Sequence, residues 1–256
     1  MRAMILAAGL GTRLRPLTND RPKALVEVAG HTLLELTLCR LASLGIRDVI
    51  VNVHHLADMV VDYLKKHDNF GMHVEISREE ILLDTGGGLK KAGWFFLQGG
   101  AEAEEPLLLH NVDVISTIDI RRMLHVHQKS GALATLAVQD RKTSRYLLFD
   151  ENNWLCGRRA ASDGKAEIVR PSSQLHAFAF SGVHVISPRF LSLINEEGVF
   201  SIIAAYLRLA GQGEKIGMFR ADQYYWRDMG KPDNIAQVAA DLESEVLHLP
   251  MRQTSL

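Results

Sequence analysis

Apolar residues in this chain come in short runs that alternate with longer segments, whose apolar residues recur every three or four positions. The short runs have the length of buried strands, and the longer segments have the spacing of amphipathic helices. This alternation predicts an α/β fold with a mostly parallel central sheet flanked by helices. The predicted strands lie at 3–8, 48–53, 72–77, 106–113, 133–138, 176–186 and 215–219, and the predicted helices lie at 32–44, 55–66, 89–97, 119–129, 188–194, 201–210 and 232–247.

The alternation of strands and helices breaks down between residues 144 and 182. Two apolar stretches, 146–149 and 154–157, are joined by a polar turn and predict a β-hairpin. Residues 158–173 are polar with little periodicity, which is typical of a mobile loop. We therefore expect a small β insertion over about 144–182, within one domain.

A glycine-rich basic loop follows the first predicted strand. Gly9 and Gly11 have no Cβ, so backbone N–H groups in this loop can approach a polyphosphate closely. Arg13, Arg15 and Lys23 supply positive charge, although Arg15 could equally be a surface charge. A loop of this kind after a strand predicts a phosphate site at the edge of the sheet.

Two better-known glycine loops do not fit these residues. A dinucleotide-binding fingerprint needs a third glycine where this chain has Leu14, and the Walker pattern of Gly-Lys-Ser/Thr is absent. Pro16 and Pro22 make a regular helix between them unfavourable. We therefore expect the loop to wrap around its ligand and not to open a helix beneath it.

Carboxylates occur at two positions that are expected to face the ligand. Asn111 and Asp113 end the predicted strand 106–113, and Asp228 lies in an aromatic-rich turn before the last predicted helix. In α/β sheets the carboxyl ends of strands face the binding crevice, where carboxylates suit Mg²⁺. Each aspartate could instead simply cap a helix.

Two further glycine positions have a structural and a functional explanation. Gly86 begins a run of three glycines before the predicted helix 89–97, as expected of a flexible loop or of backbone that approaches a nucleoside. Gly182 interrupts the predicted strand 176–186, and an interior glycine weakens a strand unless something must approach its backbone.

Residues 6–18, Leu-Ala-Ala-Gly-x-Gly-Thr-Arg-Leu-x-Pro-Leu-Thr, together with Pro22-Lys23, resemble the signature of the sugar-1-phosphate nucleotidylyltransferases. The likeness extends over most of the chain through Asn-x-Asp at 111–113 and Trp-x-Asp-x-Gly at 226–230. Within that family the chain most resembles short bacterial enzymes related to N-acetylmuramate-1-phosphate uridylyltransferase. Val112 departs from the pattern, because relatives usually have Gly or Ala there.

The resemblance implies a Rossmann-like fold of the nucleotide-diphospho-sugar transferase type. It also implies Mg²⁺-dependent transfer of a nucleotidyl group to a sugar 1-phosphate, with release of pyrophosphate. The implied catalytic residues are Arg13 and Lys23, the metal ligands are Asp113 and Asp228, the nucleotide-binding residues are Leu6, Ala8, Gly9, Gly11, Thr12 and Gly86, and the sugar-binding residues are Asn111 and Gly182.

The choice of substrate is less constrained than the reaction. The run Thr85 to Gly88 resembles relatives that favour UTP, so UTP is the expected nucleotide. The alternatives are guanylyl transfer to a mannose- or heptose-type 1-phosphate, nucleotidyl transfer to a molybdopterin or phosphocholine, and a non-catalytic nucleotide-sugar-binding protein. Two metal-binding aspartates together with Lys23 speak against the last of these.

Composition excludes several other classes of protein. The chain has 256 residues, 47% hydrophobic and 23% charged, with a net charge of −1, which argues against nucleic acid as a partner. No apolar run approaches the length of a membrane span, and no signal peptide is evident. Cys39 and Cys156 are expected to be reduced, buried thiols in a cytoplasmic protein. We expect a single domain over 1–248 with a tail at 249–256, as a monomer or small homo-oligomer, with an NTP and a sugar 1-phosphate as its partners.

Overall fold

The computed structural model describes residues 1–98, 105–162 and 164–250. Contacts between Cα atoms group the chain into two compact units, which are described separately below. The polar residues 98–105, for which the sequence predicts a solvated loop, fall almost entirely outside the described residues. The prediction of one domain over 1–248 stays a prediction. Unit 1 comprises 1–82, 110–118 and the chain from 225 on, and unit 2 comprises 83–109 and 119–224.

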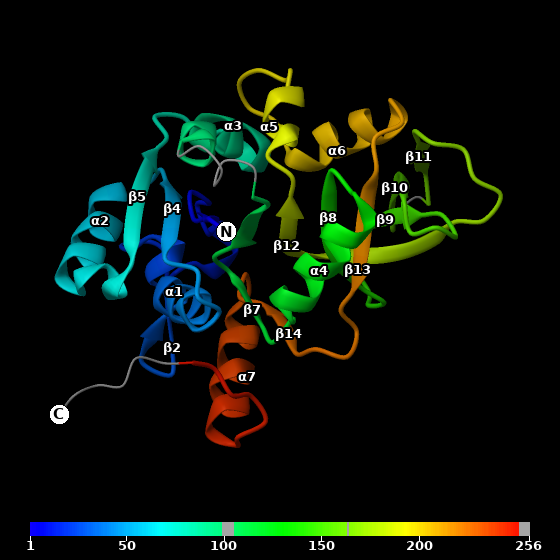
Figure 1. Cartoon of the computed structure of the whole chain (residues 1–256). Helices are drawn as coiled ribbons and strands as arrows, with labels where there is room; N and C mark the ends of the chain where they lie inside the picture. The colour runs from blue at the N-terminus through cyan, green and yellow to red at the C-terminus, as the bar shows by residue number, and fades with distance from the viewer. Residues whose placement is uncertain (99–104, 163, 251–256) are drawn as a thin grey trace. The chain divides into compact units, whose positions relative to one another are not determined.

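Unit 1 is built on a parallel sheet in the order β1-β4-β5 (Figure 1). Helix α1 connects the first two of these strands and α2 connects the second to the third, as predicted from the alternating pattern. Every residue of β4 after Asp48 is buried, as expected for a central parallel strand covered on both faces. The bounds are Ala3–Leu6 for β1, Asp48–Val53 for β4, His73–Arg78 for β5, Leu33–Ser43 for α1 and Ala57–Lys66 for α2.

Helix α1 begins where the sequence predicted. The Thr32 side chain accepts a hydrogen bond from the Glu35 backbone N–H at 3.1 Å, which satisfies one of the unpaired donors of the first turn. The apolar stripe of the helix, which includes Leu34, Leu38 and Leu41, is buried. The capping residue and the stripe together fix which face of α1 packs against the core of unit 1.

The remaining strands of unit 1 are short, and helix α7 follows the last of them. Strand β7 pairs with β14 in an antiparallel ladder, and β6 contributes its last two residues to this unit. Helix α7 ends before residue 247, its predicted end, because Glu245 adopts a left-handed backbone conformation with φ of 58°. The bounds are Glu27–Val28 for β2, His31–Thr32 for β3, Leu107–Asn111 for β6, Val114–Ser116 for β7, Trp226–Asp228 for β14 and Pro232–Glu243 for α7.

Unit 2 contains a mixed sheet. Strand β8 pairs with β13 in parallel and with β12 antiparallel, and Figure 1 shows the three strands together. The N-terminal end of β12 also pairs with β9, which continues through β10 to β11. The bounds are Ala134–Gln139 for β8, Arg145–Phe149 for β9, Leu155–Ala160 for β10, Ala166–Ile168 for β11, His176–Ile186 for β12 and Ile216–Arg220 for β13.

The β insertion predicted at about 144–182 is present, with one more strand than expected. The hairpin β9–β10 is as predicted, but β11 lies inside the stretch 158–173 that the sequence indicated as a loop. Strand β11 has only three residues, all of them exposed, which is too short a segment for an alternating pattern to be recognised in the sequence. The strand is held by backbone pairing with β10 and by an ion pair of 2.7 Å between Arg158 and Glu167.

Gly182 marks a bulge in β12. Its φ of 75° lies in the left-handed region, and the pairing of β12 with β8 shifts register between Phe180 and His184. The strand therefore has the break that the sequence indicated, and the glycine has a local structural reason for it.

Helix α3 (Asp84–Leu97) begins five residues before the predicted start at Leu89, so the glycine run is its first turn and not a loop. The N–H groups of Gly86 and Gly87 both donate to the Phe200 carbonyl, at 3.0 and 3.2 Å. A Cβ added at Gly86 would overlap the Phe200 ring. Unit 2 also contains α4 (Ile120–Ser130), α5 (Arg189–Leu193) and α6 (Ile202–Gly211).

The two cysteines differ in burial. Cys156 is buried as expected, whereas Cys39, on α1, is only half-buried.

Among the helices that the structure describes, none combines the length and apolar character needed to cross a membrane.

The packing at Gly86 gives a prediction about stability. Gly86→Ala should lower the free energy of unfolding by about 1–3 kcal/mol, because the added methyl group must displace the Phe200 ring. Gly93→Ala, in the same helix, is the matched control: its Cβ would lie 3.9 Å from Leu191, an ordinary contact, and alanine favours a helix. Denaturant unfolding of both variants measures the difference, and equal stability of the two would contradict the packing explanation.

Candidate functional site

The loop after β1 is folded back on itself around Gly11. This residue has a φ of 64°, and an added Cβ would lie 2.9 Å from Thr18 Cγ2. The Thr18 hydroxyl donates to the Gly11 carbonyl at 2.8 Å, which closes the loop. As predicted, no α-helix opens here: residues Thr12–Leu14 and Lys23–Leu25 each form a single 3₁₀ turn. Gly11 is therefore required for the shape of the loop.

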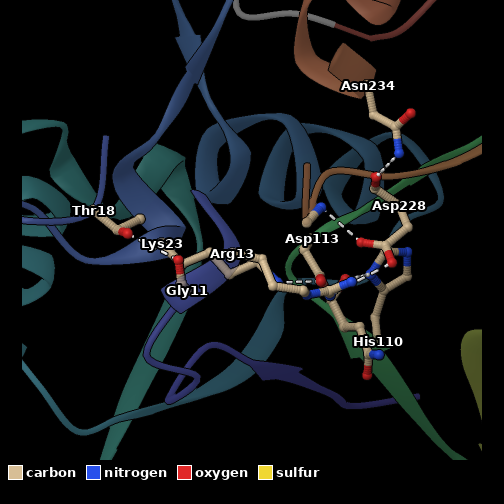
Figure 2. Close-up of polar contacts among 10 residues, drawn as sticks. Gly11, Arg13, Thr18, Lys23, His110, Asp113, Asp228 and Asn234 are labelled. Atoms are coloured by element: carbon tan, nitrogen blue, oxygen red, sulfur yellow. Dashed lines mark hydrogen bonds and ion pairs between the residues drawn. The ribbon is translucent and has the colours of Figure 1, made fainter. Parts of the chain in front are cut away.

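The pairing of β7 with β14 brings Asp113 and Asp228 together. Asp228 is paired with Val114, the residue after Asp113, and the Met229 N–H donates to the Asp113 carbonyl at 2.7 Å. The two carboxylates are thus carried by adjacent backbone segments, although they lie far apart in the sequence (Figure 2). Their proximity is built into the strand register.

Each of these carboxylates faces a cation from the chain that follows β1, Lys23 in one case and Arg13 in the other. Lys23 Nζ donates to Asp113 Oδ2, and both side chains are largely shielded from solvent, at 12% and 16% exposed. Arg13 Nη2 lies 3.7 Å from Asp228 Oδ2, and these side chains are 60% and 36% exposed (Figure 2). The first pair is tight and the second is loose, so Arg13 is the group with more freedom to change partner.

Asp228 is held in place by residues of its own segment. The Gly230 N–H donates to Asp228 Oδ1 at 2.7 Å, and Asn234 Nδ2, in the first turn of α7, donates to the Asp228 carbonyl at 2.6 Å. A Cβ at Gly230 would overlap the Arg13 guanidinium. Gly230 stood in the motif that the sequence analysis noted, but neither its role nor that of Asn234 was predicted.

The segment before Asp113 is anchored in the core of unit 1. The Val112 side chain is buried, and its N–H donates to the Leu6 carbonyl at 3.1 Å, so this β-branched residue packs in the core. His110 Nδ1 donates to the Asn111 carbonyl at 2.8 Å, and burial lowers the pKa of His110 to about 3. His110 is therefore neutral at physiological pH.

Arg40 supports the segment on the other side of Asp113. This residue of α1 donates to the Ser116 hydroxyl at 2.7 Å and to the Ile118 carbonyl at 2.5 Å. The strand that begins directly after Asp113 is thereby fixed to the first helix of unit 1.

The other predicted site residues differ in their exposure and in the unit to which they belong. Thr12 and Arg15 are exposed, Gly9 has open space where a Cβ would lie, and Ala8 is buried. Their predicted contacts with nucleotide stay predictions, as do those of Gly86 and Gly182, which belong to unit 2. Leu6, Ala8, Gly9, Gly11, Thr12, Arg13, Lys23, Asn111, Asp113 and Asp228 all belong to unit 1.

The charges in this part of unit 1 suit an anionic ligand together with a divalent cation. Two carboxylates and two cations meet at the glycine-rich loop, and guanidinium and ammonium groups are the usual partners of phosphate oxygens. In the described part of the chain, no three His, Cys, Asp or Glu residues form a group that could hold a metal ion alone. A cation bound by Asp113 and Asp228 would therefore need further ligands of another kind, such as amide or backbone oxygens, water or substrate.

Comparison with known proteins places these residues in a family. The nucleotidyl transferase family model matches residues 2–245. N-acetylmuramate alpha-1-phosphate uridylyltransferase of Caulobacter vibrioides is 34% identical over 248 residues, covering 93% of this chain and 95% of that protein. Mannose-1-phosphate guanylyltransferase of Mycobacterium tuberculosis is 29% identical over 244 residues, covering 94% of this chain. The match covers 64% of that second relative, which is less than two thirds of its length.

Solved structures show the same fold at lower sequence identity. HddC from Yersinia pseudotuberculosis, complexed with GMP-PN, matches with a TM-score of 0.73 and 19% identity, covering 94% of this chain and 99% of that one. A putative glucose-1-phosphate thymidylyltransferase from Bacillus anthracis, in complex with a sucrose, matches with a TM-score of 0.74 and 19% identity, covering 97% of each chain. These matches confirm the predicted fold class, a mostly parallel central sheet flanked by helices.

Together with the match over nearly the whole chain, the signature loop and its paired carboxylates lead to one conclusion: the chain belongs to the nucleotidyl transferase family, and it is an enzyme of the sugar-1-phosphate nucleotidyltransferase type.

Proposed function

We propose that this enzyme transfers a uridylyl group from UTP to a hexose 1-phosphate of the N-acetylmuramate type, and that the reaction requires Mg²⁺. The observation that carries the proposal is the meeting of Arg13 and Lys23 with Asp113 and Asp228 at the glycine-rich loop. The 34% identical relative, whose name specifies uridylyl transfer to N-acetylmuramate 1-phosphate, supports the choice of substrates. Both proposed substrates are soluble metabolites, so we place the reaction in the cytoplasm.

The donor atoms at this place fit Mg²⁺. Asp113 and Asp228 offer oxygen ligands from adjacent backbone segments, and Mg²⁺ commonly takes one or two carboxylates together with water and phosphate oxygens. Asn111 Oδ1, close in sequence to Asp113, is buried and has no hydrogen-bond partner among the described residues. Mg²⁺ bound by Asp113 and Asp228 would neutralise charge on the triphosphate and on the sugar phosphate.

Catalysis in this proposal consists of positioning and charge neutralisation. The attacking group is a phosphate oxygen that is already anionic, so no general base is needed. Arg13, the more exposed cation, binds the β- and γ-phosphates and stabilises the departing pyrophosphate. Lys23 contacts the phosphoryl oxygens where the two substrates converge. The loop of Gly9 and Gly11 offers backbone N–H groups to the nucleotide.

Guanylyl transfer to a mannose-type 1-phosphate is the second candidate. It is favoured by the guanylyltransferases among the relatives, including the one from Mycobacterium tuberculosis at 29% identity. Both candidates share the same reaction class and the same charged residues. They differ in the base and the sugar that the enzyme accepts.

Loss of either proposed metal ligand should nearly abolish turnover. Asp113→Asn and Asp228→Asn each remove a carboxylate charge without changing side-chain size. The Tm should change little for Asp228→Asn, whose Arg13 partner is exposed, and should fall for Asp113→Asn, because the shielded Lys23 loses its ion-pair partner. The Mg²⁺ concentration for half-maximal pyrophosphate release should rise in any residual activity. Asp58→Asn, at an exposed carboxylate of α2, serves as the control with unchanged activity. Full activity of either site variant at saturating Mg²⁺ would remove that residue from the metal site, and loss of folding would favour a capping role.

The two cations of the loop should affect the rate more than their exposed neighbour does. Arg13→Ala should lower kcat/KM at least about tenfold, because the loss of a charge-assisted contact in the transition state costs a few kcal/mol. Lys23→Ala should have a comparable effect, and Arg15→Ala a smaller one, since Arg15 is exposed. Steady-state kinetics with both substrates provide the comparison, and the reverse order would show that Arg15 is the arginine that faces the triphosphate.

A pyrophosphate-release screen that crosses the common nucleoside triphosphates with a panel of sugar 1-phosphates tests the substrates. We expect Mg²⁺-dependent turnover with UTP and an N-acetylmuramate-type 1-phosphate. Strong turnover with GTP and none with UTP would overturn the base assignment and favour the second candidate. Absence of pyrophosphate from every pair, in protein that binds nucleotides well, would contradict the proposed reaction.

A further inference from the structure

The first residue of the glycine-rich loop is held by a buried side chain that has no role in the reaction proposed above. Asn52, in the central strand β4, is 2% exposed, and its Oδ1 accepts a hydrogen bond from the Ala7 N–H at 2.7 Å. Its Nδ2 donates to Glu79 Oε1 at 2.7 Å. Glu79 is itself only 5% exposed, and its backbone N–H donates to the Val53 carbonyl at 2.8 Å. All of these residues belong to unit 1.

The two partners give the Asn52 amide a single orientation. The Ala7 N–H can only donate, so it meets the amide oxygen, and Glu79 Oε1 accepts from the amide nitrogen. If the amide were rotated by half a turn, its NH₂ group would face the Ala7 N–H and its oxygen would face Glu79. Both contacts would then be repulsive. Glu79 thereby directs the oxygen of Asn52 toward Ala7.

This contact coincides with the end of β1. The parallel ladder between β1 and β4 pairs Leu6 with Asn52 as its last register pair. Beyond that point the Asn52 side chain, and not the next backbone carbonyl of β4, accepts the N–H of the chain. The chain can therefore leave the sheet at Ala7 without an unsatisfied buried donor.

We propose that Asn52, oriented by Glu79, is a positioning residue for nucleotide binding. The pair fixes the point and direction in which Ala7, Ala8 and Gly9 leave the sheet, and thus sets the backbone that meets the nucleotide. The inference rests on the proposed function in that the loop is taken to bind the nucleoside triphosphate. Neither side chain needs to touch the substrate, so the effect should appear in affinity for the triphosphate and not for the sugar 1-phosphate.

The Asn52→Asp variant tests this pair. It presents a carboxylate to Glu79, so that two acceptors face each other where an amide donated before. We expect KM for the nucleoside triphosphate to rise about tenfold or more, because a buried polar contact is lost. KM for the sugar 1-phosphate should stay unchanged. The Kd of the triphosphate, measured by calorimetry without turnover, should rise by the same factor.

The double variant Asn52→Asp/Glu79→Gln is the matched rescue. The amide introduced in place of Glu79 can donate to one oxygen of the carboxylate introduced in place of Asn52, while the other oxygen of that carboxylate accepts the Ala7 N–H. Triphosphate affinity should therefore return to within about threefold of the parent. Asn152→Asp adds the same charge at an exposed turn and should leave both KM values unchanged. Should Asn52→Asp fail to fold, Asn52→Ser, whose hydroxyl is too short to reach both partners, takes its place.

Three results would overturn the inference. These are an Asn52 variant that keeps its triphosphate affinity, a parallel rise of both KM values with a lowered Tm, and a double variant without rescue. The calorimetric Kd separates this test from the proposed reaction, because it does not depend on turnover. A wild-type protein that binds the triphosphate but releases no pyrophosphate would contradict the proposed reaction and still allow the Asn52 pair to be tested.

Discussion

The arrangement of charges in unit 1 depends on the antiparallel ladder between β7 and β14. These strands are only three residues long, yet their register places Asp228 opposite Val114 and lets Met229 donate to the Asp113 carbonyl. A shift of one residue would turn one of the two carboxylates to the other face of the ribbon. Arg40 fixes one strand to α1, and Asn234 fixes the other at the first turn of α7. Helices at both ends of the chain therefore support one pair of side chains.

Most of the fold could be predicted from the sequence because its elements carry local signals. The strand 48–53 has an apolar run that only Asn52 interrupts, and α1 has both a capping threonine and an apolar stripe, so their bounds were close to those observed. Strand β11 and the start of α3 were missed for different reasons. Strand β11 has only three residues, too few for an alternating pattern to be recognised, and it is defined by backbone pairing with the neighbouring β10. The first turn of α3 depends on Phe200, a partner far away in the sequence, and a run of glycines gives no sign of such a partner.

The residues of the candidate site also differ in whether the sequence around them signals their role. Arg13, Lys23, Asp113 and Asp228 could be named from motifs, because charged residues beside glycine turns stand out in a sequence. Asn52, Glu79 and Asn234 could not, since each acts on the backbone of another segment through a single hydrogen bond or directs a side chain that does. The structural reason for a glycine is likewise not visible in the sequence. Gly11 and Gly86 look alike in the sequence, but the first needs a left-handed conformation and the second makes room for an aromatic ring.

The two ion pairs mean that the charges of this region cancel before any ligand arrives. A lone phosphate ion must compete with a carboxylate for each cation, and a lone divalent cation must compete with Lys23 or Arg13 for each carboxylate. Either ion, when it binds alone, breaks as many attractive contacts as it makes. A metal ion and a polyphosphate that arrive together offer every group a new partner of opposite sign. If the region binds both as proposed, it favours the complex over its separate components through exchange of partners and not through excess charge.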